Sequence, residues 1–116
     1  MSYKSFEDLD VWKRACRLAT SIYKHLQGCK DHGLRNQMTR SAVSIASNIA
    51  EGAERNSALE FKRFLHIAKG SSAELRTQLY IANRIGLLEK KVTAELVEET
   101  KALSAKLQTL VNSLKT

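Results

Sequence analysis

The stretch SALEFKRFLHIAKGSSAELRTQLYIANRIG, residues 57–86, decides the fold. It opens with Ser57 and, three residues later, Glu60, which is the S-x-x-E pattern of a capping box at a helix N-terminus. It closes at Gly86, a residue type that commonly adopts the left-handed conformation after a helix. Apolar and small residues between these ends recur at spacings of three and four, which predicts one amphipathic helix over residues 58–85. The residues of this stripe are Phe61, Phe64, Leu65, Ala68, Ser72, Leu75, Leu79 and Ala82.

Three further segments show the same helical periodicity, and they predict helices over residues 6–27, 33–52 and 93–114. No segment alternates β-branched and polar residues over its full length, so the sequence indicates no strand. Proline, which interrupts helices, is absent from the 116 residues. Because short connections join long helices, we predict an all-α fold: an up-down-up-down antiparallel four-helix bundle that forms a single domain over residues 1–116.

The ends and middles of these helices carry further signals. Ser5 followed by Asp8 resembles a capping box, and Gly28 suits a left-handed stop after the first helix. Gly52 is expected to end the second helix, followed by a ragged turn through Arg55. Gly70 lies inside the third helix, where glycine costs about 1 kcal/mol relative to alanine. Close approach of a neighbouring backbone at Gly70 would compensate for this cost.

The third helix has a second apolar side beside its main stripe. At about 100° per residue, this side carries Ile67, Ser71, Gln78, Ile81 and Ile85. A helix that is apolar around more than half of its circumference either touches two neighbouring helices or forms part of an oligomer interface. The sequence leaves both alternatives open.

Polar residues follow the apolar face of the second helix at spacings of four, four and three, and the third helix offers a similar set. Such side chains are buried only when paired, because an unsatisfied buried polar group costs roughly 1–3 kcal/mol. We therefore expect an inter-helix polar network in which an arginine neutralises a carboxylate, the alternative being a catalytic or ligand-binding carboxylate site. The network residues are Arg40, Ser44, Asn48, Glu51, Ser71, Glu74 and Gln78.

Three segments carry a resemblance to a known family: FEDLDVWKRA at 6–15, QMTRSAVSIASNIAEG at 37–52 and EFKRFLHIAKGSSAELRTQL at 60–79. Together they resemble the four-helix bundle proteins encoded in intervening sequences of bacterial 23S ribosomal RNA genes. That family is distantly similar to the accessory variability proteins of diversity-generating retroelements. The family often has a proline after the Ser-Ile pair of the second segment. Here that position is Ala46, which favours a straighter second helix.

The resemblance covers essentially the whole chain and has implications beyond the fold. It implies a left-handed four-helix bundle, assembly as a ring-like homopentamer, and no established enzyme activity. The retroelement relatives bind nucleic acid and a reverse transcriptase through positively charged surfaces. The resemblance therefore directs attention to the basic residues of this chain.

The formal net charge is +7, which favours polyanionic partners. Basic residues line up on the first and third predicted helices, where they can neutralise phosphates, and an aromatic residue among them can stack on a base. The alternative is a solvated face that keeps the protein soluble. The predicted nucleic-acid-binding residues are Lys13, Arg17 and Lys24 on the first helix, with Lys62, His66, Lys69, Arg76, Tyr80 and Arg84 on the third.

Other chemistry finds little support in the sequence. There is no phosphate-binding glycine-rich motif, and His25, Cys29 and His32 lack the fourth ligand of a structural zinc site. We expect no metal and no cofactor. The absence of a long apolar stretch and of a signal peptide predicts a cytoplasmic protein with no membrane contact, so that Cys16 and Cys29 are reduced thiols.

The sequence thus predicts a non-enzymatic, oligomeric helical protein that binds RNA or DNA through basic stripes without strong sequence specificity. No zinc finger, helix-turn-helix or RNA-recognition motif supports specific readout. The alternative is a protein-interaction scaffold or accessory subunit that makes no direct contact with nucleic acid.

Overall fold

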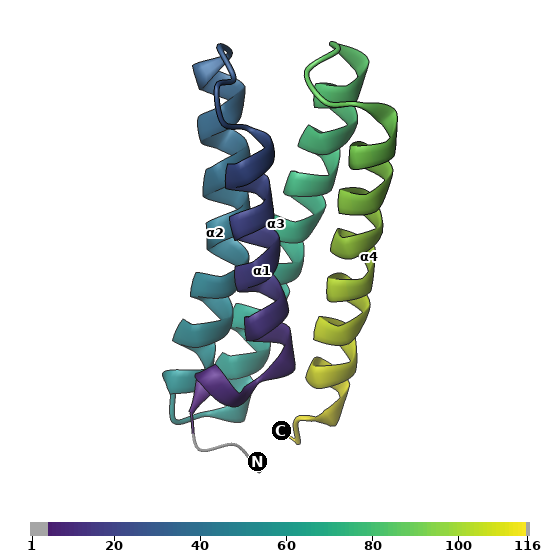
Figure 1. Ribbon diagram of the computed structural model, residues 1–116. Helices are drawn as coiled ribbons and strands as arrows, with labels where there is room; N and C mark the ends of the chain where they lie inside the picture. The colour runs from purple at the N-terminus through teal and green to yellow at the C-terminus, as the bar shows by residue number, and fades with distance from the viewer. Residues whose placement is uncertain (1–4, 116) are drawn as a thin grey trace.

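The computed structural model describes residues 5–115. Within this range the chain forms four α-helices and a short 3-10 turn, and it contains no strand, which confirms the all-α four-helix fold. The helices follow one another along a bundle of 44 × 20 × 19 Å, and Figure 1 shows them running in alternating directions. The elements are η1 (Phe6–Asp8), α1 (Asp10–His25), α2 (His32–Glu54), α3 (Ala58–Arg84) and α4 (Lys90–Ser113).

Each helix packs against its neighbours in the chain. α3 lies between α2 and α4 and has its most extensive contacts with both, whereas α1 packs well on α2 but only over a short seam on α4. α1 and α3 are diagonal to each other and do not pack directly within residues 5–115. α3 is therefore the helix that joins the two halves of the bundle.

The core comes from the apolar stripe of each helix. All eight residues predicted for the stripe of α3, from Phe61 to Ala82, are buried. Ile22 of α1, Ile45 and Ile49 of α2 and Leu103 of α4 are at most 1% exposed. Burial of each such side chain stabilises the fold by roughly 1.5–3 kcal/mol. The periodicity of the sequence thus placed the core face of α3 correctly.

Most predicted helix ends are also confirmed. Gly28 and Gly86 have φ angles of 76° and 80°, the left-handed conformation expected after α1 and α3. The Ser57 side chain accepts a hydrogen bond of 3.2 Å from the Glu60 backbone N–H at the start of α3. α4 begins at Lys90, three residues before the predicted start at Thr93. The reason is that the Thr93 hydroxyl donates to the Glu89 carbonyl and so lies inside the first turn rather than capping it.

The start of α1 differs from the prediction. Ser5 caps only the 3-10 turn η1, accepting from the Glu7 backbone N–H, and α1 begins at Asp10. Leu9 between them is extended, with ψ of 127°. The Phe6 ring packs edge-on against Trp12 with centroids 5.2 Å apart, so η1 folds back onto α1 rather than extending it.

Two glycines have roles opposite to those expected. Gly52 does not end α2, which continues to Glu54. A Cβ at Gly52 would lie 2.6 Å from the Phe64 Cβ and 3.1 Å from the Phe61 Cδ1, so the missing side chain allows α2 and α3 to approach closely. Gly70, by contrast, is exposed, and no atom of residues 5–115 would lie within 4 Å of a Cβ there. No described residue of the same chain therefore makes the expected close backbone approach at Gly70.

This contrast predicts opposite effects for the same substitution. Gly52→Ala should lower the free energy of unfolding by about 1–3 kcal/mol, because the added methyl group overpacks the contact with Phe64. Gly70→Ala should raise it by up to about 1 kcal/mol, because alanine is the better residue inside an unobstructed helix. Urea unfolding followed by far-UV circular dichroism measures both, and a neutral Gly52→Ala would contradict the close packing of α2 on α3.

Candidate nucleic-acid interface

Part of the predicted polar network joins α2 to α3. The hydroxyl oxygens of Ser44 and Ser71 are 2.9 Å apart and form a hydrogen bond across the two helices. The Asn48 side chain donates to the Ser44 hydroxyl at 2.9 Å and to the Ser44 carbonyl at 2.8 Å. These three residues form a continuous, half-buried chain of hydrogen bonds that fixes how α2 and α3 face each other.

The other predicted members lie outside this chain. Arg40, Glu51 and Glu74 are exposed, and Glu51 pairs at 3.4 Å with Arg55, the residue that follows α2. Within residues 5–115 the Arg40 side chain makes no hydrogen bond or ion pair, so the expectation that it neutralises a carboxylate is not met. At about 100° per residue, Arg40 lies farther from α3 than Ser44 and Asn48 do, and its guanidinium faces solvent.

Gln78, the last predicted member, is in an unusual environment. The residue is only 7% exposed, and its Oε1 has no hydrogen-bond partner within the described part of the chain. A buried carbonyl oxygen without a donor is costly, by about 1–3 kcal/mol. Gln78 lies on the same side of α3 as Ser71, which is seven residues, or two helical turns, before it.

A second hydroxyl network, between α3 and α4, was missed by the sequence analysis. The Ser72 hydroxyl donates to the Thr100 carbonyl at 3.1 Å and accepts from the Ser104 hydroxyl at 2.9 Å. Ser72 is fully buried, as its place in the apolar stripe predicts. Its hydroxyl, however, makes hydrogen bonds instead of apolar contacts alone. The sequence carried no signal for this pairing, because the partner residues depend on the rotation of α4.

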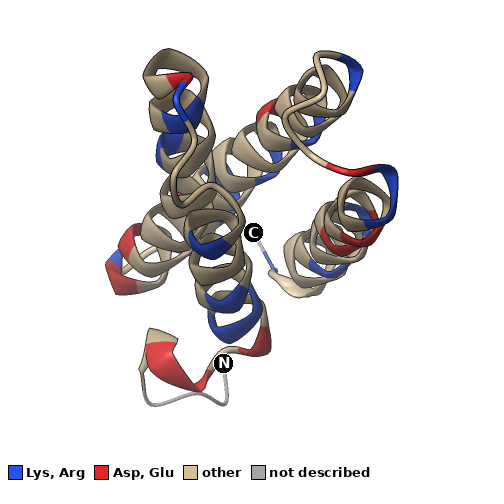
Figure 2. Ribbon diagram, turned by 45° about the horizontal axis from the view of Figure 1, so that its top comes forward, with Lys and Arg blue, Asp and Glu red and all other residues tan. Residues whose placement is uncertain are grey.

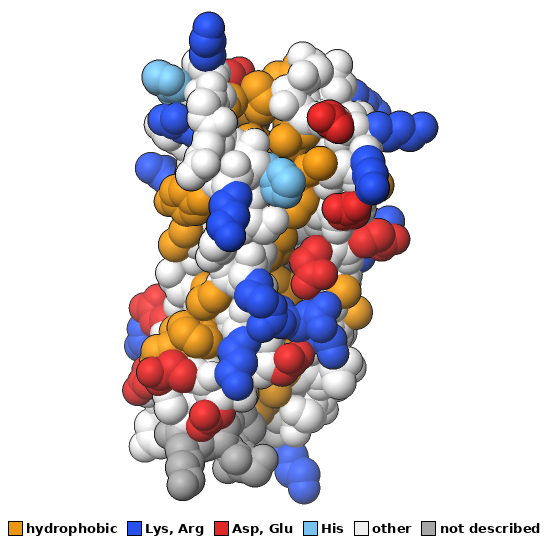
Figure 3. All heavy atoms as spheres, viewed as in Figure 1, with side chains coloured by type: hydrophobic (Ala, Val, Ile, Leu, Met, Phe, Trp, Pro, Cys, Tyr) orange, Lys and Arg blue, Asp and Glu red, His pale blue; other side chains and the backbone are white. Residues whose placement is uncertain are grey.

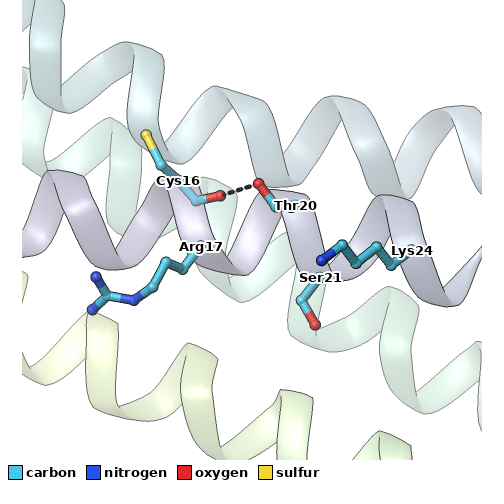
Figure 4. A pocket seen from close by; sticks show the side chains of 5 residues that line it. All are labelled: Cys16, Arg17, Thr20, Ser21 and Lys24. Atoms are coloured by element: carbon cyan, nitrogen blue, oxygen red, sulfur yellow. Dashed lines mark hydrogen bonds between the residues drawn. The ribbon is translucent and has the colours of Figure 1, made fainter.

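The two predicted basic stripes lie on separate surfaces. Figure 2 shows Lys and Arg along both α1 and α3, which do not pack on each other. On α1, Lys13, Arg17 and Lys24 are exposed. Arg17 and Lys24 also line a shallow cavity of about 360 Å³, in which Lys24 extends back toward Ser21 and Arg17 points away from Ser21 (Figure 4).

The basic charge of α1 is partly balanced by neighbouring acids. Arg14 pairs with Glu99 of α4 at 3.3 Å, and Asp10 pairs with Lys106 of α4 at 3.8 Å. Figure 3 shows Lys and Arg side chains gathered over the lower part of this face, with acidic side chains beside them over α4. The α1 surface is therefore of mixed charge.

The basic residues of α3 that face α4 form a different surface. Lys69 donates to the Gln108 side chain of α4, and Arg76 follows two turns later on the same line of α3. α4 contributes Lys90 and Lys101, which line a cavity together with Tyr80. His66 and Arg84 are exposed beside this surface, and Lys62 lies two turns before Lys69. The α3–α4 basic surface is defined here as Lys69, Arg76, Tyr80, Lys90 and Lys101.

Sequence reasoning missed Lys90 and Lys101. They are eleven residues apart, or three helical turns, so they lie on one line of α4. The same spacing joins Lys13 to Lys24 on α1 and was the available signal. Which side of α4 faces α3, however, follows only from the packing of the two helices.

Among residues 5–115, a few side chains have shifted pKa values. Burial raises the pKa of the Cys16 thiol, which makes it a weaker nucleophile. The Arg63 side chain donates to Glu60 at 3.0 Å, and this hydrogen bond lowers the pKa of the Glu60 carboxyl group. Residues 5–115 contain no group of three His, Cys, Asp or Glu side chains that could hold a metal ion. No helix in the same range is long and apolar enough to cross a membrane.

Comparisons with known proteins agree with this architecture. The fold matches the crystal structure of a protein with unknown function from the S23 ribosomal protein family of Bacteroides thetaiotaomicron VPI-5482, with a TM-score of 0.83 and 22% identity over 89% of this chain and 99% of that chain. At this identity the likeness shows the fold alone. No curated protein matches the chain. The model of the family described as 23S rRNA-intervening sequence protein matches residues 7–109, so this chain belongs to the 23S rRNA-intervening sequence protein family.

Proposed function

We propose that this protein is a non-enzymatic, self-associating protein of the bacterial cytoplasm that binds RNA or DNA through the α3–α4 basic surface. The observation that supports this most is the convergence of lysine and arginine side chains from two helices on one seam, around an exposed tyrosine. Lys and Arg side chains bind phosphates whatever the sequence, and this surface offers no element that reads base edges in a groove. The proposed binding is therefore salt-sensitive and without strong sequence preference.

The α3–α4 basic surface is favoured over the α1 stripe by its surroundings. On α1, Glu99 of α4 pairs with Arg14 and reduces the field that a phosphate would meet. Among the described residues that line the cavity of the α3–α4 seam, only Glu98 is acidic. The cavity on α1 has no acidic residue among its described lining, so the preference for the seam rests on the basic side chains that two helices contribute to it and on its exposed tyrosine.

A second surface supports self-association. Ile67, Ile81 and Ile85 are 40%, 45% and 57% exposed on the outer side of α3 that borders α2. Gly70 lies on the same side with open space above it, and Gln78 has an unpaired carbonyl oxygen there. We name these five residues the isoleucine face. A second copy of the chain would cover its apolar side chains and pack against Gly70.

The ring-like homopentamer implied by the family resemblance is the assembly we propose for this contact. The competing function is a scaffold whose isoleucine face recruits a different protein and which makes no contact with nucleic acid. A pull-down with and without nuclease separates the two, because partners lost on nuclease treatment were held through nucleic acid.

Nucleic-acid binding can be tested with two triple Glu variants of equal charge. Each changes the formal net charge from +7 to +1, so any difference between them reports a site and not the overall charge. The variants replace Lys69, Arg76 and Lys101 on the α3–α4 basic surface, or Lys13, Arg17 and Lys24 on α1. We expect the first to lower affinity at low salt by at least about 100-fold and to reduce the slope of log K against log salt by about 2–3. The second should change both quantities much less.

Fluorescence anisotropy titrations with a labelled oligonucleotide at several salt concentrations give both quantities. Far-UV circular dichroism must show that each variant remains helical. Absence of binding by the unmodified protein at low salt would refute the nucleic-acid function. Equal losses in the two variants would refute the assignment to the α3–α4 basic surface.

Self-association is tested by Ile81→Lys, with Val43→Lys as the control. Both residues are exposed, at 45% and 41%, but Val43 borders α1 rather than the isoleucine face. Burying an unpaired lysine in an apolar contact is unfavourable, so Ile81→Lys should shift the solution mass to that of one chain, whereas Val43→Lys should not. Light scattering coupled to size-exclusion chromatography measures the mass. A monomeric unmodified protein would rule out this assembly.

A further inference from the structure

A cavity of about 290 Å³ opens on the α3–α4 basic surface. It is lined by Tyr80 and Asn83 of α3 and by residues of α4 from Lys90 to Lys101. Cavities that bind small molecules usually measure about 300–1,000 Å³, so the volume of this one lies just below that range. It is large enough for one planar ring system and too small for a duplex.

The helix register places Tyr80 over the middle of this cavity. Ser72 of α3 is level with Thr100 and Ser104 of α4, to which it is hydrogen bonded. The two helices are antiparallel, so a step forward along α3 corresponds to an equal step backward along α4. Tyr80 is eight residues after Ser72, and it therefore lies beside residues 92–96 of α4, which are eight residues before Thr100 and Ser104. This level lies between Lys90 and Lys101, which are about 16 Å apart along the helix at 1.5 Å per residue.

The cavity combines an aromatic side chain with an apolar base. Tyr80 is 46% exposed, so one part of its ring is free to stack. Ala94 and Val97 of α4 line the same cavity and provide apolar contact opposite. A nucleobase stacks on an aromatic ring whatever its identity, because every base has a π-face.

Polar groups around the cavity match a nucleotide. Lys90 and Lys101 are exposed and form no ion pair within residues 5–115, so both ammonium groups are available to phosphates. The Asn83 amide nitrogen donates to the Leu88 carbonyl at 3.1 Å, which leaves its oxygen as an acceptor. Glu98 adds another acceptor. The Asn83 oxygen and the Glu98 carboxylate can both accept hydrogen bonds from exocyclic amino groups of a base. Glu98 repels phosphate, so the phosphate contacts are made by the two lysines.

From this geometry we infer that the Tyr80 cavity binds one unpaired nucleobase of single-stranded RNA or DNA, while Lys90 and Lys101 bind phosphates on its two sides. The inference rests on the proposed nucleic-acid function and specifies its ligand as a single strand. In a duplex the base is stacked and paired, so it would first have to leave the helix at a cost in free energy. The protein therefore prefers single strands to duplexes of the same length.

The test compares Tyr80→Ala with Tyr23→Ala. Tyr23 is a suitable control because it is also exposed, at 54%, and lies on α1 away from the α3–α4 basic surface. Anisotropy titrations use a labelled single-stranded oligonucleotide, its duplex, and the same strand carrying abasic positions. Tyr80→Ala should weaken single-strand binding about tenfold or more, whereas Tyr23→Ala and Tyr80→Phe should leave it nearly unchanged.

Further readouts separate stacking from charge. Tyr80→Ala should leave the salt dependence of binding unchanged, because tyrosine neutralises no phosphate. Abasic positions should weaken binding by the unmodified protein and have little effect on Tyr80→Ala. Equal affinity for single strand and duplex, or equal losses in Tyr80→Ala and Tyr23→Ala, would overturn the inference and leave the proposed function standing. Failure of the unmodified protein to bind either nucleic acid at low salt would overturn both.

Discussion

The rotation of α3 about its own axis is fixed by two adjacent serines, and the surfaces of the bundle depend on it. Ser71 bonds to Ser44 of α2, while Ser72 bonds to Thr100 and Ser104 of α4. Neighbouring residues of a helix point about 100° apart, so one serine of the pair contacts α2 while the other contacts α4. Each bond contributes only about 0.5–1.5 kcal/mol, but a rotated α3 would bury the same hydroxyls without partners.

Because the rotation of α3 is fixed, the solvent-exposed part of its circumference consists of two surfaces with different chemistry. The side toward α2 carries the isoleucine face, whereas the side toward α4 carries Lys69, Arg76 and Tyr80. At about 100° per residue, the centres of these two surfaces are separated by roughly 150° around the helix. The close contact at Gly52 supports the same arrangement, because it brings α2 near enough to α3 for Ser44 to reach Ser71.

The sequence predicted those features that depend on one helix alone. The stripe of α3, its Ser57 cap and the left-handed Gly28 and Gly86 all follow from local spacing or backbone conformation, and the structure confirms them. Gly52 was misread as a helix end because glycine has two roles, and only the position of Phe64 distinguishes close packing from termination.

Features that join two helices were predictable only in part. The stripe of polar residues on α2 indicated Ser44 and Asn48, but their spacing did not show that Arg40 would face solvent. Lys90 and Lys101 form a line on α4 that the sequence displays, yet their neighbour across the seam is set by the register of Ser72 against Ser104. A candidate site on the surface of a helical bundle contains residues from two helices. Its residues can therefore be identified only when the register of one helix against the other is known.

The separation of the two surfaces has a consequence for any assembly. If copies associate through the isoleucine face, the α3–α4 basic surface of each copy stays uncovered, because it lies on the far side of α3. Several such surfaces on one particle would bind a single polyanion with a high effective concentration after the first contact. Weak, salt-sensitive binding by one chain would then become firm binding by the assembly. In this arrangement the isoleucine face of α3 would determine how many basic surfaces one assembly carries. The α3–α4 basic surface would determine which ligand those copies bind.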